Sequence, residues 1–104
     1  MKPGEIYVVD LGLTGKVRPC VVVSREDTNA PRNLVVFVPL TTANRGSPYE
    51  VALGKLRFLH AESWANVQGL FSWEQARVGR RLGTVTAAQR ESIRAALRYL
   101  LELS

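Results

Sequence analysis

The sequence predicts a mainly β protein, a small and partly open barrel of short strands closed by a C-terminal helix. β-Branched and aromatic runs recur at roughly ten-residue spacing in the first half of the chain, with turn-forming Gly, Pro and Asn between them. Apolar side chains near the C-terminus instead recur at helical spacing. The chain has 104 residues, of which 46% are hydrophobic, so we expect one domain, residues 1–104, with one ordinary core.

Four strands are predicted in the first half of the chain. Ile6–Leu11 is rich in β-branched and aromatic residues, and two glycines soon after it indicate a turn. Cys20–Ser24 contains a continuous apolar run, which is typical of a strand buried on both faces, and Pro19 fits its first position, where no ladder N–H is needed. The third and fourth strands, each preceded by a polar loop with turn residues, are Leu34–Leu40 and Tyr49–Leu53.

The second half is expected to hold two short strands and a helix. The strands, Trp64–Val67 and Leu70–Trp73, flank Gly69. Thr86 followed by Gln89 is a capping-box pattern, which predicts that the helix begins there. Its apolar stripe is predicted to consist of Ile93, Leu97, Leu100 and Leu101. A flank of solvated arginines, paired with Glu91 and Glu102, is expected at Arg90, Arg94 and Arg98.

The positive net charge and its uneven distribution along the chain have two explanations. The formal net charge is +5, the sequence pI is about 10.0, and 11 of the 14 basic residues are Arg, the side chain suited to forked contacts with phosphate. Residues 1–52 hold 6 basic and 5 acidic side chains, whereas residues 53–104 hold 8 and 4. A nucleic-acid partner explains this asymmetry, and so does solubility alone.

Several classes of function are excluded by composition. One Cys and one His make neither an internal disulfide nor a two-Cys, two-His metal site, and the carboxylates show no metal-ligand spacing. The chain has no phosphate loop of the nucleotide-hydrolysing type. It also has no apolar run long enough to span a membrane and no signal peptide, so we expect a cytoplasmic protein without membrane association. Cys20 is expected to be buried and inert, and His60 to have a surface or packing role.

An arginine and a hydroxyl are the strongest candidates for chemistry. Arg18 lies between a predicted turn and a buried strand, and Thr41 follows the next strand. If these two strands are neighbours, both side chains face one cleft. A guanidinium and a hydroxyl suit a phosphodiester, because they bind its non-bridging oxygens and stabilise the charge that develops there. Surface Arg and Thr pairs are common, so this pattern alone leaves a structural role open.

The same residues carry a resemblance to a known family. Four segments occur in the family's order, and Arg77, Gly83–Val85 and the helix match its ending; the segments are Gly4–Asp10, Gly15–Ser24, Val38–Thr42 and Pro48–Val51. In these features the chain resembles the MazF/PemK toxins. The resemblance implies an SH3-like barrel of the PemK/MazF/CcdB type that forms a homodimer. It also implies an mRNA interferase, an endoribonuclease that cuts single-stranded RNA at short sequences without a metal or cofactor.

Roles for individual residues follow from the resemblance. Arg18 takes the place of the family's essential arginine and Thr41 that of its catalytic hydroxyl, while the RNA's own 2′-hydroxyl attacks the phosphate and leaves a 2′,3′-cyclic phosphate and a 5′-hydroxyl. Lys16, Thr42 and Gln68, the last on the expected groove strand, are candidate RNA contacts, although Lys16 equally suits a solvated loop charge. No residue is identified as the general base. The expected protein partner is a MazE-like antitoxin with an acidic, partly disordered tail.

The sequence departs from the family's pattern and leaves rival functions open. Phe71 stands where relatives often have a basic residue, and Gly69 where they often have Gln, which puts the recognised RNA sequence in doubt. Phe71 or Trp73 could stack an unpaired base, but a role in the core is the simpler interpretation. CcdB toxins share this type of barrel and poison DNA gyrase without cleaving anything, so the fold does not decide the function. An inactive RNA-binding module is a third alternative.

Overall fold

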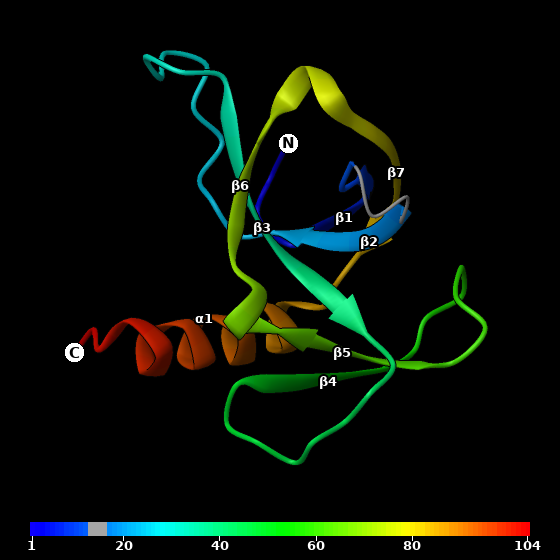
Figure 1. Ribbon diagram of the computed structural model, residues 1–104. Coiled ribbons are helices and arrows are strands. Elements are labelled where there is room, and N and C mark those ends of the chain that lie inside the picture. The colour runs from blue at the N-terminus through cyan, green and yellow to red at the C-terminus, as the bar shows by residue number, and fades with distance from the viewer. Residues whose placement is uncertain (13–16) are drawn as a thin grey trace.

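The computed structural model describes residues 1–12 and 17–104, which form an antiparallel seven-stranded sheet and a C-terminal helix (Figure 1). Two short 3₁₀ helices, η1 (Val67–Gly69) and η2 (Gln75–Arg77), flank β6. The long helix α1 spans Ala87–Leu101. The strands are β1 (Glu5–Asp10), β2 (Val17–Val22), β3 (Leu34–Thr41), β4 (Glu50–Lys55), β5 (Glu62–Asn66), β6 (Phe71–Glu74) and β7 (Val78–Thr84).

Strand β3 organises the sheet because it pairs with a different strand along each part of its length. Its first half, from Leu34 to Phe37, pairs with β6, and its middle, from Phe37 to Pro39, pairs with β2. Its last residues, Leu40 and Thr41, pair with β5. The strand order is therefore β4-β5-β3-β2-β1-β7 with β6 beside β3, and β4 and β7 are the open ends of the barrel. Figure 1 shows β3 running from the layer of β1, β2 and β7 to the layer of β4, β5 and α1.

Both faces of β2 are buried, as the continuous apolar run predicts. Val21 belongs to a core that α1 covers with Ile93 and Ala96. Cys20 and Val22 belong to a second core on the opposite face. The alternation follows from the two-residue period of a strand, which sends successive side chains to opposite faces. The sequence predicted one core, but the structure has two hydrophobic clusters, one on each face of the sheet.

The helix begins as the capping-box pattern predicts. The Thr86 hydroxyl accepts a hydrogen bond from the Gln89 N–H, and the Gln89 side chain accepts one from the Thr86 N–H. The predicted apolar stripe is wrong at its last member, because Leu101 is 49% exposed, whereas Ala96 is buried. Leu101 lies about 80° around the helix from Ile93, at 3.6 residues per turn, and so leaves the face that packs on β4 and η1.

Three further differences from the predicted elements concern the site. Strand β2 begins at Val17, so Arg18 lies within a strand, and Pro19 takes its third position, paired with Val8 of β1 but with no residue of β3. Strand β7 was not predicted, because its Gly and Arg residues show no apolar alternation. A Cβ at Gly79 of β7 would lie 2.9 Å from the Val8 carbonyl oxygen, so the absence of a side chain permits this pairing.

Among residues 1–12 and 17–104, no helix combines the length and apolar character needed to cross a lipid bilayer.

Candidate functional site

A pocket opens where β3 leaves β2 to pair with β5. Its volume is about 400 Å³. Three parts of the chain supply its walls: the start of β2, the end of β3, and the loop that leads into β5. The lining residues are Val17, Arg18, Pro19, Leu40, Thr41, Thr42, Leu59, His60, Ala61 and Ser63. The pocket therefore exists because one strand changes partners and leaves a gap beside the strand that it has left.

Arg18 and Thr41 line this pocket together, as the sequence predicts for neighbouring strands. The antiparallel pairing of β2 with β3 ends at Cys20 and Pro39. Continuing that register by two residues brings Arg18 opposite Thr41. Both side chains are half-buried and belong to residues that line the pocket, so the two strands hold them beside it. No ion pair engages Arg18 in the described part of the chain.

The Thr41 hydroxyl has a defined hydrogen-bond partner. Its oxygen accepts a hydrogen bond of 3.1 Å from the Ala43 N–H, two residues further along the chain. A hydroxyl that accepts from the backbone still has its own O–H to donate. Thr41, which lines the pocket, thus retains a proton that it can donate. Thr42 follows directly, is exposed and lines the same pocket.

His60 lies at the surface, as one of the two roles expected for it requires, and it also lines the pocket, which the sequence analysis did not predict. It lies in the loop between β4 and β5, is exposed, and lines the pocket with Arg18 and Thr41. The loop is held by a hydrogen bond of 3.0 Å from the Leu59 N–H to the Leu56 carbonyl. A second bond runs from the buried Ser63 hydroxyl to the Ala61 carbonyl, 3.4 Å away. No local pattern around His60 marks this position, because the loop meets Arg18 only through the tertiary fold.

Cys20 is buried and inert, as predicted. Burial raises the pKa of its thiol to about 12, and the positive charge of nearby Arg18 opposes this shift only in part. Its Sγ lies 3.7 Å from the Arg18 carbonyl oxygen. The thiol is therefore no nucleophile at neutral pH, although it lies two residues from a pocket residue.

The remaining candidate RNA contacts are placed differently. Gln68 is exposed in η1, not on a strand, and is not one of the residues that line the pocket. Lys16 lies outside the described residues. Phe71 and Trp73 pack on the second core, where Phe71 stacks on Phe37 with ring centroids 5.6 Å apart. The core interpretation of these two aromatic side chains is therefore correct.

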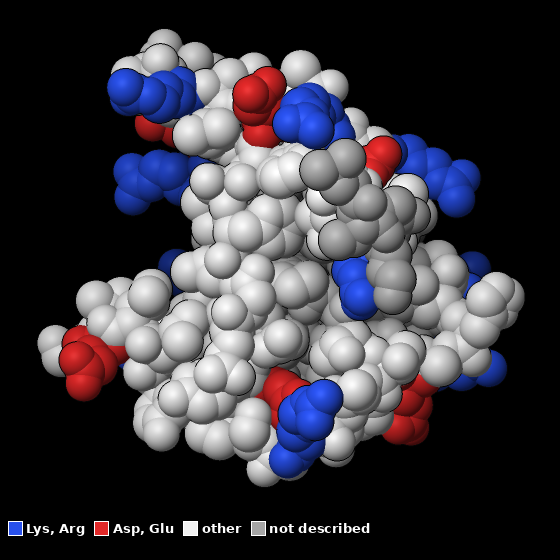
Figure 2. Space-filling view, viewed as in Figure 1, with Lys and Arg blue, Asp and Glu red and all other residues white. Residues whose placement is uncertain are grey.

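Charged groups do not mark the site by themselves. On the face in Figure 2, Lys and Arg side chains are spread mainly around the margin, with acidic side chains among them and a largely uncharged middle. Within residues 1–12 and 17–104, no group of three His, Cys, Asp or Glu side chains is arranged to hold a metal ion. The polar side chains that line the pocket are the guanidinium of Arg18, the imidazole of His60 and three hydroxyl groups, those of Thr41, Thr42 and Ser63.

Comparisons with known proteins agree with this architecture. Residues 2–101 match the family described as "PemK-like, MazF-like toxin of type II toxin-antitoxin system". No curated protein sequence matches the chain. The chain is similar to a solved structure of an endoribonuclease in complex with its cognate antitoxin from a mycobacterial species. The TM-score is 0.86 and the identity 32%, over 100% of this chain and 97% of that one.

Two further solved structures have the same fold. One is the Mycobacterium tuberculosis toxin MazF-mt6, with a TM-score of 0.83 and 24% identity over 96% of this chain and 98% of that one. The other is a MazE–MazF complex from Deinococcus radiodurans, with a TM-score of 0.79 and 24% identity over 100% of this chain and 97% of that one. The mainly β fold with a C-terminal helix is thus confirmed. The chain belongs to the PemK-like, MazF-like toxins of type II toxin–antitoxin systems.

Proposed function

We propose that this toxin is a sequence-specific endoribonuclease that cleaves single-stranded RNA without a metal ion. The observation that carries the proposal is the single pocket lined by Arg18, Thr41 and His60. A cation, a neutral donor and a group that can exchange a proton are the components that phosphodiester cleavage by an internal nucleophile requires.

The reaction forms one bond and breaks one. The ribose 2′-oxygen attacks the adjacent phosphorus as its hydroxyl proton leaves, and the bond from phosphorus to the 5′-oxygen of the next nucleotide breaks as that oxygen gains a proton. The products are a 2′,3′-cyclic phosphate and a 5′-hydroxyl. Since the substrate supplies the nucleophile, the protein needs only to position the phosphate, stabilise its charge and handle the protons.

Arg18 and Thr41 act on the phosphate. The Arg18 guanidinium forks onto the non-bridging oxygens and stabilises the charge that builds up on them during attack. The Thr41 hydroxyl, whose oxygen already accepts the Ala43 N–H, donates its proton to one of the same oxygens. Arginine remains protonated in proteins, so it does not serve as the base.

His60 supplies the proton acceptor that the sequence analysis left without a candidate. Its imidazole takes the 2′-hydroxyl proton, and histidine is the side chain that most often serves as a general base. Its place in the same pocket as Arg18 and Thr41 supports the assignment. The leaving 5′-oxygen takes a proton from water, and the hydroxide that remains takes the 2′-hydroxyl proton back from the His60 imidazolium.

Partners and RNA contacts complete the proposal. Thr42, in the pocket beside Thr41, is proposed to contact the RNA, as are Lys16 and Gln68. The solved MazF structures that share this fold include complexes with an antitoxin. We propose that this chain likewise binds a MazE-like antitoxin with an acidic tail, works as a homodimer and acts in the cytoplasm, where RNA is available.

Incubation of the pure protein with a long unstructured RNA in EDTA tests the function. Cuts at defined sequences that leave 5′-hydroxyl ends, absent with Arg18→Ala, support the ribonuclease. Intact RNA together with stalled gyrase supports a CcdB-like poison, which the family match does not favour. Intact RNA bound in a salt-sensitive manner supports an inactive RNA-binding module. Loss of cleavage in EDTA, restored by a divalent cation, contradicts the metal-free mechanism.

A further inference from the structure

The loop between β4 and β5, residues 56–61, supplies one wall of the catalytic pocket with Leu59, His60 and Ala61. It projects beyond the ends of these two strands (Figure 1). His60 is exposed, and no ion pair engages its imidazole in the described part of the chain. The position of the imidazole therefore depends on how the loop itself is held.

One aromatic ring fastens this loop to a distant strand. A Cβ at Gly83 of β7 would lie 2.6 Å from the Phe58 Cε1 and 3.3 Å from its Cδ1, so the half-buried ring lies directly against the Gly83 backbone. Only a residue without a side chain leaves room for the ring there. Gly83 pairs with Ile6 of β1, whose side chain is fully buried. The ring thus rests on a well-packed part of the sheet.

The loop is also held on both sides of the ring. The Leu59 N–H donates to the Leu56 carbonyl at 3.0 Å and closes the turn that carries Phe58. These three side chains pack against the first core cluster. Beyond the turn, the buried Ser63 hydroxyl donates to the carbonyl of the last loop residue, 3.4 Å away. His60 lies between these two fixed points.

We propose that Phe58 is a positioning residue, whose ring on Gly83 holds the loop so that the His60 imidazole stays beside the bound phosphodiester. This inference rests on the proposed function, in which His60 is the base. Proton transfer requires hydrogen-bond reach, and a misplacement of about 1 Å costs up to roughly 10²-fold in rate. Phe58 does not line the pocket, so it acts on the reaction only through the loop.

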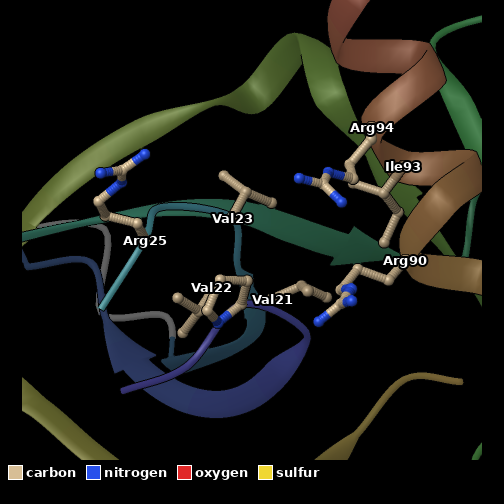
Figure 3. A pocket seen from close by; sticks show the side chains of 8 residues that line it. Val21, Val22, Val23, Arg25, Arg90, Ile93 and Arg94 are labelled. Carbon is tan, nitrogen blue, oxygen red and sulfur yellow. The ribbon is translucent and has the colours of Figure 1, made fainter. Parts of the chain in front are cut away.

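A general loss of core packing is the alternative role for this ring, and the recess under α1 provides the control. Its volume is about 170 Å³, and it shares no lining residue with the catalytic pocket. Arg90 and Arg94, which were predicted on a solvated flank, border it, and Figure 3 shows them reaching from the helix toward the valines. Ile93 also lines the recess and belongs to the cluster against which Phe58 packs. Ile93→Val therefore disturbs the same core without changing a residue of the loop or of the catalytic pocket.

Phe58→Leu tests the proposal, because leucine remains apolar but lacks the ring atoms that touch Gly83. Single-turnover RNA cleavage should fall roughly tenfold or more. In the His60→Gln background the same substitution should change cleavage by less than about twofold, since the group that the ring positions is already absent. Binding of an RNA with a 2′-deoxynucleotide at the cleavage site, measured by fluorescence anisotropy, should change by less than about twofold.

Gly83→Ala displaces the ring from the other side and should slow cleavage in the same way. Phe58→Leu added to Gly83→Ala should cause little further loss, because leucine has no Cε1 to meet the new methyl group. The steady-state ¹⁵N–¹H NOE of the His60 amide, which is sensitive to picosecond-to-nanosecond motion, should fall in Phe58→Leu and stay unchanged in Ile93→Val. Thermal unfolding of each variant verifies its fold.

Three results in cleavage would overturn the proposal. An equal fall in the wild-type and His60→Gln backgrounds means that the ring acts through another group. A fall with Ile93→Val as large as that with Phe58→Leu means that general core packing is responsible. Cleavage by Phe58→Leu within twofold of the wild type means that the ring is not needed.

The NOE distinguishes a failure of this inference from a failure of the proposed function. If the wild type does not cleave RNA, or if His60→Gln cleaves as fast as the wild type, the proposed function fails in its activity or in its base. A His60 NOE that is lower in Phe58→Leu than in Ile93→Val still supports the anchor on Gly83. An NOE that Phe58→Leu leaves unchanged overturns it.

Discussion

Arg18 and Thr41 lie two residues beyond the last paired positions of β2 and β3, Cys20 and Pro39, at the point where β3 turns to pair with β5. Because the two strands separate there, the space between them is a pocket and not a continued ladder. Two side chains that are distant in the sequence thus face one cavity from rigid strands, which is a favourable arrangement for preorganised charge stabilisation.

Replacement of Arg18 tests the charge-stabilising group. Arg18→Ala should slow RNA cleavage by about 10²–10³-fold, or ~3–4 kcal/mol of barrier, the usual cost of one preorganised donor to a developing oxyanion. Arg18→Lys should recover only part of this loss, since lysine retains the charge but not the fork. Single-turnover cleavage of a labelled RNA measures the effect. Arg32→Ala, which removes an exposed arginine from the β2–β3 loop, is the control. Cleavage by Arg18→Ala within tenfold of wild type would remove Arg18 from the mechanism.

Replacement of Thr41 tests the hydroxyl. Thr41→Val keeps the shape of the side chain but removes both its O–H and the acceptor of the Ala43 N–H, and cleavage should fall by roughly tenfold or more. Thr41→Ser should retain most of the activity, because it retains both hydrogen bonds. Thr28→Val is the control in an exposed loop. Equal activity of the Val and Ser variants would show that the Thr41 hydroxyl is not used.

Replacement of His60 tests the proposed base. In His60→Gln the rate of RNA cleavage should be lower by about 10²-fold or more, because the amide does not accept the 2′-hydroxyl proton. Single-turnover cleavage of a labelled RNA measures the effect. The chain has one His, so no second imidazole complicates the interpretation. Cleavage by His60→Gln within tenfold of the wild type would assign the proton transfer to another group.

A tight contact beside the site makes a prediction about stability. A Cβ at Gly69 would lie 2.5 Å from the Pro39 Cγ, so Gly69→Ala should lower the free energy of unfolding by about 1–3 kcal/mol. Pro39→Ala removes the ring atom that clashes, and the double variant should therefore be less destabilised than the sum of the single variants. Urea unfolding of all four proteins completes the cycle. Strict additivity would show that the two residues do not meet.

The reactivity of the Cys20 thiol shows whether β2, the strand that also carries Arg18, opens. Because burial raises the pKa of its thiol to about 12, the native protein should hold almost no thiolate at pH 8 and react slowly with iodoacetamide. In urea the thiol returns to its ordinary pKa range, and alkylation should accelerate strongly. Mass spectrometry of the alkylated protein measures both rates. Rapid labelling in the native state would mean that the β2 core opens readily.

Local patterns in the chain predict those features whose cause is local. The capping box at Thr86 and Gln89 and the buried apolar run of β2 depend on residues close in sequence, and both are confirmed. Strand β7 has no such pattern, because its formation depends on pairing with β1 at the other end of the chain. Leu101 lies about 80° around the helix from Ile93, outside the face of α1 that packs on β4 and η1, and it is therefore exposed.

The residues alone therefore predicted that the first half forms strands and where the helix starts, and they indicated that Arg18 and Thr41 face one cleft. Only the tertiary structure decided that His60 joins them and that Arg90 and Arg94 border a recess. The reason is physical: periodicity and capping act over a few neighbouring residues, whereas a pocket forms between segments that are distant in the chain, where strands separate or a helix crosses a sheet. The local sequence around a histidine in a loop, or around an arginine on the flank of a helix, is the same whether that side chain faces solvent or a cavity.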